Sequence, residues 1–455
     1  MIVMKFGGTS VADAERIRAV AGVLGRIPRR PVVVVSALAG VTNLLDEAFA
    51  AAKADDLERL EPLLADIERR HRWALAGAVD DARQRHDLGL EIDRLFEELR
   101  ERLRSLRILG EGTPRVRDAV LACGESLSAR IVAAAFRGYG LPARWVDPAQ
   151  VMLTDGRFGA AAPDAEGVRE RCDACLVPLV EAGELPVLGG FVGATAEGQT
   201  TTLGRGGSDT SAAILALALA AQELEIWTDV DGLMSADPGL VPGARTLETL
   251  SFAEAAELAL YGARVLHPDS IAPAVRRNIP VRILNSLRPE RRGTLVLAER
   301  REPGAQGAPL AVATKQGMGL ARLTSRRMPM EPALARRALE LCATAGVVPE
   351  ILLSSATTVT LVATGIDGLA ALHVLEDQAD VEVLPECAIV CLVGGAVANV
   401  ARLRATVLAE LATGEPELIA TGAFRASIVA VVRQRELATL VRRLHDVFFE
   451  GGTKP

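Results

Sequence analysis

The order of apolar segments constrains the fold more than any other feature of the chain. Along roughly the first 300 of its 455 residues, short β-branched runs alternate with amphipathic helical stretches. This alternation is typical of an α/β domain whose parallel strands are joined by helices. We expect a mostly parallel central sheet flanked by helices, with strands at residues 2–6, 32–35, 143–146, 186–191, 224–228 and 281–284.

A charged stretch from Leu57 to Leu109 interrupts the alternation. Leu95, Leu99 and Leu103 recur every four residues, which is the spacing of one helix face. We expect a helical hairpin laid on the sheet edge, with its charges on a solvated face.

The alternation ends at residues 299–309, which read ERREPGAQGAP and carry no apolar period. We place a domain boundary there, after a first domain at residues 1–298. Beyond it, the order strand, helix, strand, strand, helix occurs twice, and Leu369-Ala-Ala-Leu372 and Leu437-Ala-Thr-Leu440 open the matching second helices. This repeat predicts two βαββαβ modules, at residues 310–385 and 386–455.

Composition excludes several classes of protein. A net charge of -7 and a pI near 5.5 argue against a nucleic-acid binder, and 3% aromatic residues leave few stacking platforms. The longest apolar run, residues 212–221, is about half of the ~20 residues that a membrane span needs. The N-terminal sequence MIVMKFGG lacks the layout of a signal peptide, so we expect a cytoplasmic protein that binds no membrane.

Six cysteines raise the question of a metal or redox site. Cys172 and Cys175 form a CxxC, but the other close pair, Cys387 and Cys391, is about two hundred residues away, and no histidine accompanies either pair. We expect reduced thiols that pack as small hydrophobic side chains.

The first candidate site is the sequence Lys5-Phe6-Gly7-Gly8-Thr9-Ser10. Only four of the 51 basic residues are lysines, and Lys5 stands where a strand ends at two glycines and a helix follows. Glycines at a strand end and the amides of a helix start suit a phosphate, although a tight turn explains the same pattern. Neither GxxxxGK[ST] nor GxGxxG occurs in the chain.

Two further turns contain residues suited to ligand binding. Gly204-Arg205-Gly206-Gly207-Ser208-Asp209-Thr210 precedes an apolar helix, where Ser208 and Asp209 are either N-caps or parts of an anion pocket beside Arg205. Trp227-Thr228-Asp229-Val230-Asp231-Gly232 ends a predicted strand in a polar turn. Glu125 in Cys123-Gly124-Glu125 and His267 before Pro268 are equally compatible with structural roles.

Together and in this order, seven motifs resemble those of aspartate kinases of the amino-acid kinase superfamily. They are KFGGTS (5–10), SALAGVTN (36–43), GES (124–126), GGFVG (189–193), TTLGRGGSDTSA (201–212), WTDVDG (227–232) and GARVLHP (262–268). The resemblance covers nearly the whole chain. It implies an amino-acid kinase catalytic domain followed by two ACT-type regulatory modules.

The resemblance also implies roles for individual residues. Lys5 and Asp209 would be catalytic, and no residue is implied as a metal ligand. The ATP site would contain Lys5, Gly7, Gly8, Thr9, Ser10, Thr228, Asp229, Met234, Arg264 and Val265. The L-aspartate site would contain Ser36, Thr42, Glu125, Phe191, Arg205, Gly206, Gly207 and Ser208, with Arg205 on the α-carboxylate and Glu125 facing the ammonium.

The implied reaction is ATP- and Mg²⁺-dependent phosphorylation of the β-carboxylate of L-aspartate to 4-phospho-L-aspartate, the first step toward lysine, threonine and methionine. Lysine or threonine would act as an effector at the ACT-type modules, whose exposed strand edges would pair in a homodimer or higher homo-oligomer. The loop before the first module's helix has Pro329 and Pro332, which lack the backbone donor that an effector carboxylate needs.

Two alternatives stay open at the level of the sequence. One is a related amino-acid kinase that acts on another acidic substrate. The other is a catalytically weak amino-acid sensor, which is favoured by Met234, Gly239 and Arg264, where aspartate kinases commonly have an aromatic residue, an arginine and a lysine.

Overall fold

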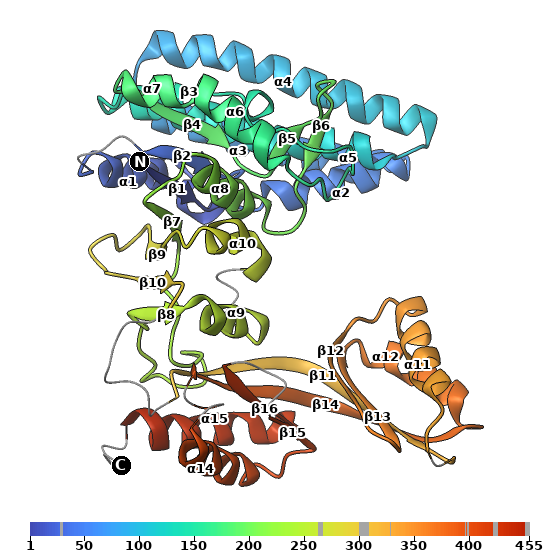
Figure 1. The fold of residues 1–455 in the computed structure, drawn as a ribbon. Coiled ribbons are helices and arrows are strands. Elements are labelled where there is room, and N and C mark those ends of the chain that lie inside the picture. Colours follow the sequence, from blue (N-terminus) through green and yellow to red (C-terminus); the bar gives the residue numbers. More distant parts are fainter. Residues whose placement is uncertain are drawn as a thin grey trace. The chain divides into compact units, whose positions relative to one another are not determined.

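The computed structural model describes residues 1–27, 31–262, 267–299, 309–327, 329–395, 397, 400–421 and 426–450. They form two compact units, shown in Figure 1. The N-terminal unit comprises Met1–Leu233, Thr246–Phe252 and Val265–Arg300, and the C-terminal unit comprises Met234–Arg245, Ala253–Arg264 and Arg301–Pro455.

The N-terminal unit is built on an eight-stranded sheet with the order β3-β4-β2-β1-β7-β9-β10-β8. Neighbouring strands pair in parallel except for the antiparallel pair β9 and β10. The predicted mostly parallel α/β sheet is therefore confirmed. The strands are β1 (Ile2–Phe6), β2 (Val32–Val35), β3 (Ala143–Trp145), β4 (Leu185–Gly189), β7 (Glu223–Thr228), β8 (Thr249–Ser251), β9 (Val281–Asn285) and β10 (Thr294–Leu297).

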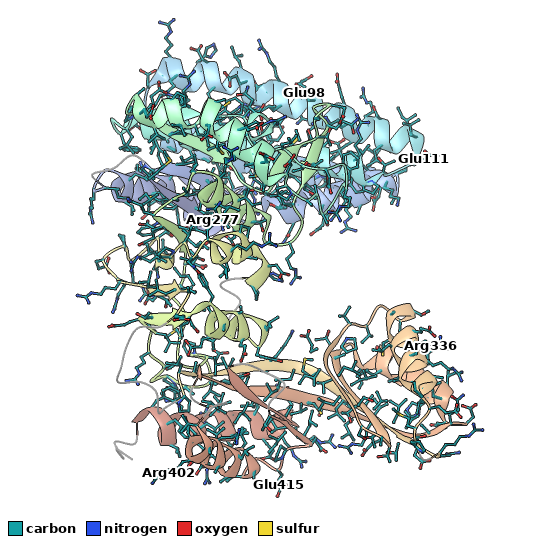
Figure 2. All side chains as sticks on the ribbon, in the orientation of Figure 1. Glu98, Glu111, Arg277, Arg336, Arg402 and Glu415 are labelled. Carbon is teal, nitrogen blue, oxygen red and sulfur yellow. The ribbon has the colours of Figure 1, made fainter. Side chains whose placement is uncertain are left out.

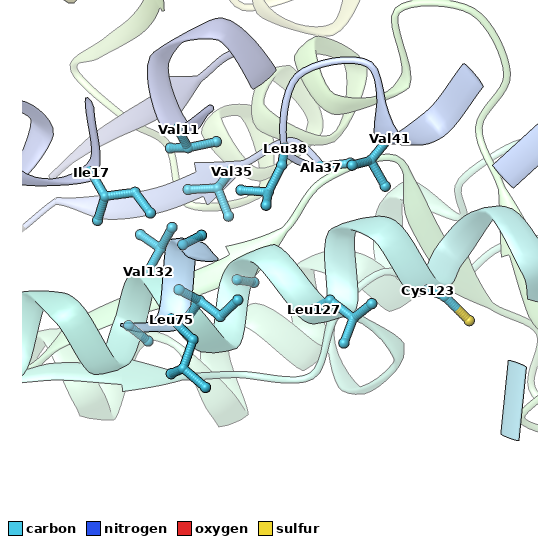
Figure 3. Close-up of a cluster of buried hydrophobic side chains, with 14 of the residues drawn as sticks. Val11, Ile17, Val35, Ala37, Leu38, Val41, Leu75, Cys123, Leu127 and Val132 are labelled. Carbon is cyan, nitrogen blue, oxygen red and sulfur yellow. The ribbon is translucent and has the colours of Figure 1, made fainter. Parts of the chain in front are cut away.

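Helices cover both faces of this sheet. Met4, Phe6, Val33 and Val35 share one buried cluster with α1 (Ala14–Leu24), α2 (Val41–Lys53) and α5 (Pro114–Gly138), part of which is shown in Figure 3. No residue of α8 (Gly207–Ala218) belongs to that cluster, although α8 packs against β1, β2 and β7. Because strand side chains alternate between faces, α8 covers the face to which Val3 and Lys5 point. The remaining elements are α6 (Ala165–Cys175), α7 (Val177–Glu181), α10 (Pro268–Arg276) and the hairpin of β5 (Val192–Ala194) and β6 (Thr200–Thr202).

The predicted helical hairpin is present as α3 (Leu57–Ala78) and α4 (Ala82–Leu109). It packs chiefly on α1, α2 and α5, and not on the sheet edge as the sequence suggested, because its apolar stripe joins the core of those helices. The opposite side is charged, and Glu98 points away from the ribbon in Figure 2. Arg72 pairs with both Glu68 and Asp93, so the charges also link the two helices across their solvated surface.

Helix α5 runs through the core of the N-terminal unit. It is long and apolar enough to span a bilayer, but 83% of its most apolar stretch is buried inside the structure. It therefore behaves as a core helix, and its buried position fixes the two carboxylates that it carries, Asp118 and Glu125.

The C-terminal unit contains a six-stranded antiparallel sheet with the order β12-β13-β11-β14-β16-β15. The predicted repeat of strand, helix, strand, strand and helix is present in both halves. The elements are β11 (Ala311–Ser325), α11 (Pro332–Thr344), β12 (Pro349–Ser354), β13 (Thr358–Thr364), α12 (Ile366–Ala370) with the short helix Ala371–Leu375, β14 (Ala379–Val393), α14 (Ala401–Ala412), β15 (Leu418–Ala420), β16 (Ser427–Arg433) and α15 (Leu437–His445).

The two modules share their longest strands. The second half of β11 and the first half of β14 complete the first module, while Ala311–Lys315 pairs with the second half of β14 and supplies the fourth strand of the second module. Gly317 and Glu386 have left-handed backbones near the middle of these strands, where the register shifts. The sequence repeat did not reveal this exchange. The repeat begins at residue 319, so the strand segment before it, which completes the second module, lies outside the repeated pattern.

Helix α9 (Phe252–Leu260) adds to the C-terminal unit from Ala253 onward. Its Glu254 accepts a hydrogen bond from the Gly395 amide at 3.0 Å, and Glu257 accepts one from the Ala426 amide at 2.9 Å. Two segments of the predicted first domain thus pack with the regulatory-type modules. The domain boundaries of the sequence analysis stay predictions.

The six cysteines are free, and five of them are buried. Burial raises the pKa of Cys123 to about 11 and that of Cys172 to about 12. These thiols are therefore protonated and packed as the sequence analysis expected.

Val312 tests the shared strand, because it is 1% exposed and packs in the core of the second module. We expect Val312→Ala to lower the opening free energy of β14 and β16 by about 2 kcal/mol, through lost apolar burial and a residual cavity. Hydrogen exchange with mass spectrometry measures this change. The control Val374→Ala, at a position that is 66% exposed, should leave exchange of these strands unchanged. Equal effects of the two substitutions would contradict the shared-strand arrangement.

Candidate active site

The carboxyl ends of the parallel strands gather most of the predicted residues at one edge of the N-terminal sheet. Gly7 follows β1, Ser36 follows β2, Gly190 follows β4, and β7 and β9 end at Thr228 and Asn285. Open α/β sheets bind ligands beyond the carboxyl ends of their strands. This edge is therefore the candidate active site.

Lys5 lies at the centre of this edge. Its side chain points toward α8, and its Nζ lies 2.6 Å from Oδ1 of Asp209 in the first turn of that helix. Only 11% of the lysine side chain and 15% of the aspartate side chain are exposed. The ion pair joins the glycine turn after β1 to the glycine turn before α8.

Gly7 and Gly8 keep the first turn close to its neighbours. The Gly7 amide donates to the carbonyl of Trp227 at 3.0 Å, and a Cβ on Gly8 would lie 2.8 Å from the carbonyl oxygen of Ala37. Any residue larger than glycine at position 8 would push these loops apart. Thr9 is exposed at the same turn, as a phosphate ligand requires.

Ser10 is placed differently from its neighbours. Its side chain is buried, and its hydroxyl donates to Ser286 Oγ at 2.8 Å and to the Trp227 carbonyl at 3.3 Å. The hydroxyl therefore ties the glycine turn to β7 and to the residue after β9. Its predicted role at ATP is not tested by these contacts.

The second glycine turn fits closely around its neighbours. Gly204 and Gly206 have φ of 76° and 68°, which favours glycine at both positions. A Cβ on Gly190 would lie 2.7 Å from Cα of Ser208, so the strand end of β4 touches the start of α8. Arg205 is exposed between the two left-handed glycines, with its guanidinium available to solvent-borne ligands.

Phe191 has a strained backbone beside this turn. Its φ of 65° is unusual for a bulky residue. The conformation is held by hydrogen bonds of 2.9 Å from its amide to Ser211 Oγ and from the Leu203 amide to its carbonyl. Such strain is frequent at ligand sites, which agrees with the predicted placement of Phe191 at the substrate.

Glu125 is the most perturbed acid of the site. It lies on α5, is 3% exposed, and its Oε2 has no hydrogen-bond partner in the described part of the chain. Burial raises the pKa of Glu125 to about 8, against a hydrogen bond from Ala37 and the positive charge of Lys5, which lower it. A buried acid with an open acceptor suits a cationic ligand group.

Ser36 and Thr42 border the same space. The Ser36 amide donates to the Phe6 carbonyl at 3.1 Å, and its carbonyl accepts from Ser128 Oγ at 2.7 Å. Thr42 lies in the first turn of α2, and both residues are half-buried. The structure thus brings both predicted residues to the carboxyl edge.

The third turn, at residues 227–232, is held partly by Asn285 and Arg288, which the sequence analysis did not name. Thr228 donates to Asp229 Oδ1 at 3.1 Å, and the half-buried Asp231 accepts from Asn285 Nδ2 at 2.7 Å and pairs with Arg288 at 2.9 Å. Asn285 ends β9, the strand beside β7. A polar residue at the end of a strand next to a candidate site could have indicated that Asn285 belongs to that site.

Three of the predicted nucleotide contacts cannot be placed at this edge. Arg264 and Val265 lie outside the described residues, and Met234 belongs to the C-terminal unit. Their assignment to ATP stays a prediction. His267 lies at the N-cap of α10 with its Cβ close to Gly206.

The described residues contain no group of three or more acidic, histidine or cysteine side chains that could hold a metal ion. Asp209 is the one acidic side chain that contacts Lys5 directly in the described part of the site. Mg²⁺ commonly binds through one or two carboxylates together with substrate phosphates, and this donor set fits that mode.

Comparisons with known proteins identify the family of the chain. The sequence pattern of the amino acid kinase family matches residues 1–285. The chain is 33% identical over 466 residues to the lysine-sensitive aspartokinase 3 of Escherichia coli, with 99% of each chain covered.

Two crystal structures of E. coli aspartokinase III share the fold. The complex with lysine and aspartate in the T-state has a TM-score of 0.85 at 32% identity, over 99% of both chains. The complex with aspartate and ADP in the R-state has a TM-score of 0.81 at 31% identity, over 98% of this chain and 99% of the other. The chain belongs to the amino acid kinase family and, within that family, to the aspartokinases.

Glu125 predicts a dependence of stability on pH. Burial raises the pKa of Glu125 from 4.5 to about 8 in the folded state. The contribution of Glu125 to the free energy of unfolding is therefore complete below pH 4.5 and is lost as the pH rises through 8. Glu125→Gln should therefore gain stability over the unmodified protein, by up to about 1.4 kcal/mol per pH unit in this window. Urea unfolding at several pH values measures the difference. Glu101→Gln, at an exposed position of α4, should show no such trend.

Proposed function

We propose that this chain transfers the γ-phosphoryl group of ATP to the β-carboxylate of L-aspartate, with 4-phospho-L-aspartate and ADP as products. One observation carries the proposal: the ion pair between Lys5 and Asp209 joins two glycine turns that are each suited to an anion. A kinase with an acidic substrate must hold two anions side by side. Lys5 lies where both would meet.

The charge of Lys5 is the main catalytic contribution of the chain in this proposal. The β-carboxylate of aspartate is ionised at neutral pH, since an unperturbed aspartate has a pKa of about 3.9, so it needs no general base. Phosphoryl transfer then requires mainly positioning and neutralisation of charge. Lys5 reduces the repulsion between the carboxylate and the γ-phosphate. Asp209 holds the ammonium group of Lys5 in place.

Aspartate is recognised by two charged side chains in opposite environments. Arg205 offers a planar pair of donors to the α-carboxylate. Glu125 faces the α-ammonium with its unpartnered Oε2. Because burial raises the pKa of Glu125 to about 8, the ammonium ionises this acid as it binds and a proton is released at neutral pH.

ATP is held by the turn after β1 and by the end of β7. Gly8 and Thr9 offer backbone amides and a hydroxyl to the phosphates, and Gly7 holds the turn in place through its bond to the Trp227 carbonyl. Thr228 and Asp229 lie beside the rest of the nucleotide. Asp209 would help to hold a Mg²⁺ ion bound with the phosphates. Such an ion would further neutralise the phosphate charge.

Lys5→Ala tests the proposal. It removes the charge between the two anions, and we expect the rate of ADP release with aspartate to fall at least about 100-fold. A coupled ADP-release assay measures the rate, and circular dichroism checks the fold. Lys53→Ala changes an exposed lysine at the end of α2 and should keep full activity. Lys5→Arg serves as a second variant that keeps the charge near Asp209.

Near-normal turnover of Lys5→Ala contradicts the role of this residue. Equal effects of Lys5→Ala and Lys53→Ala on turnover would also contradict this role of Lys5.

We further propose that an amino-acid effector, lysine or threonine, acts on the C-terminal unit, although not through the four described loop amides that are already bonded. The amides of Ser325, Arg326, Arg327 and Met330 already donate to Thr357, Gln378, Ser325 Oγ and Ala356. Pro329 and Pro332 have no amide to offer. A carboxylate there must displace existing hydrogen bonds.

Calorimetric titration tests the effector proposal. We expect lysine to bind the full-length protein no more tightly than the millimolar range, because a bond that it gains from any of these four amides replaces one already made. Threonine titrated in parallel serves as the comparison. Micromolar binding of lysine would contradict this account of the loop.

The chain is proposed to act as a cytoplasmic homodimer or higher homo-oligomer. Its regulatory sheet has edge strands β12 and β15, and near β12 the side chains of Val348 and Leu352 are 79% and 46% exposed. Unpaired strand edges with exposed apolar side chains favour pairing with a second copy.

A further inference from the structure

A second carboxylate on α5 occupies a more enclosed position than Glu125. Asp118 is 0% exposed and lies seven residues before Glu125, which is two helical turns away on the same face. Its Oδ2 accepts hydrogen bonds from the amides of Gly159 at 2.8 Å and Thr202 at 2.9 Å, and its Oδ1 accepts one from the Thr202 hydroxyl at 2.7 Å. One buried carboxylate thus binds a loop and the end of β6 to α5.

Thr202 is held from both sides at this point. Its amide and hydroxyl bind Asp118, and its carbonyl accepts from the Ala161 amide at 2.9 Å. It is also the last residue of β6, and 1% of it is exposed. The strand therefore ends at a fixed place relative to α5.

The glycine turn for aspartate begins directly after this anchor. Arg205 follows Thr202 by three residues, and the left-handed Gly204 lies against the other anchored loop, since its Cβ would be 3.2 Å from the Gly159 carbonyl. The Asp118 carboxylate consequently fixes both the strand that leads to Arg205 and the loop on which Gly204 rests.

We propose that Asp118 is a positioning residue for the amino-acid substrate. It sets the distance between Glu125, on its own helix, and Arg205, on the turn that it anchors through Thr202. These two side chains are the proposed partners of the aspartate ammonium and α-carboxylate, so the inference rests on the proposed function. Asp118 touches no reacting atom and acts through Thr202 and Gly159.

A positioning role predicts that Asp118 affects the binding of aspartate but not the binding of nucleotide, whereas general support of the fold would affect both. The ATP turn is anchored elsewhere, by the hydrogen bonds of Gly7 and Ser10 to the Trp227 carbonyl. Loss of the Asp118 anchor should therefore raise the KM for aspartate and leave the affinity for nucleotide unchanged. A misplacement of about 1 Å in a substrate-positioning group is enough to cost on the order of 100-fold.

The test uses the full-length protein and four variants. We expect Asp118→Ala to raise the KM for aspartate about 10- to 100-fold, with the KM for ATP and calorimetric binding of ADP unchanged. Asp118→Asn should recover most of the affinity, because its amide oxygen still accepts the two backbone hydrogen bonds. Thr202→Val removes one of the three bonds and should raise the KM for aspartate severalfold.

Thr201→Val is the matched control for Thr202→Val. Thr201 is the neighbouring residue on β6, is equally buried, and uses its hydroxyl for a bond to Thr154 at 2.6 Å. It should leave the KM for aspartate unchanged. If Asp118→Ala does not fold, the comparison of the two threonine variants decides the question.

Three results would overturn the proposal. The first is a KM for aspartate that stays within about twofold of the unmodified value in Asp118→Ala, and the second is an equal rise for Thr201→Val and Thr202→Val. The third is a parallel loss of ATP and aspartate affinity. Failure of the unmodified protein to phosphorylate aspartate refutes the proposed function instead, so the two outcomes are distinguishable.

Discussion

The ion pair between Lys5 and Asp209 is the interaction on which the rest of the site depends. It is mostly withdrawn from water, and buried charges are tolerated only when they are well paired. Lys5 reaches Asp209 because β1 lies in the middle of a parallel sheet and turns alternate side chains toward α8. The same geometry places two glycine turns around one ammonium, which is the arrangement that a phosphoryl transfer to an anionic acceptor needs.

Burial gives the two carboxylates of α5 different properties. Asp118 has its oxygens satisfied by Thr202 and Gly159, so it serves as a fixed anchor. Glu125 keeps an open acceptor, and burial raises its pKa to about 8. A single apolar core helix therefore supplies one carboxylate that holds the substrate turn and one that meets a cation. Both functions need the helix to be rigid, which its position inside the N-terminal unit ensures.

Much of this could be predicted from the sequence, for reasons that are local. The strand ending at Lys5 and the repeat of the C-terminal modules were visible because periodicity and glycine turns depend on neighbouring residues. The exchange of Ala311–Lys315 between modules and the anchoring by Asp118 were not visible, because they depend on pairings over tens of residues and no local pattern marks them. Asn285 lies between these cases, since the order of parallel strands would have placed it beside Thr228.

The most direct test of the account is to identify the phosphorylated product. The full-length protein is incubated with MgATP and L-aspartate, and hydroxylamine traps any acyl phosphate as a hydroxamate for mass spectrometry. The account predicts the β-hydroxamate of aspartate, formed much faster than the corresponding products from L-glutamate or N-acetyl-L-glutamate. Faster formation from either of those acids, or ATP consumption with no aspartyl hydroxamate, would contradict it.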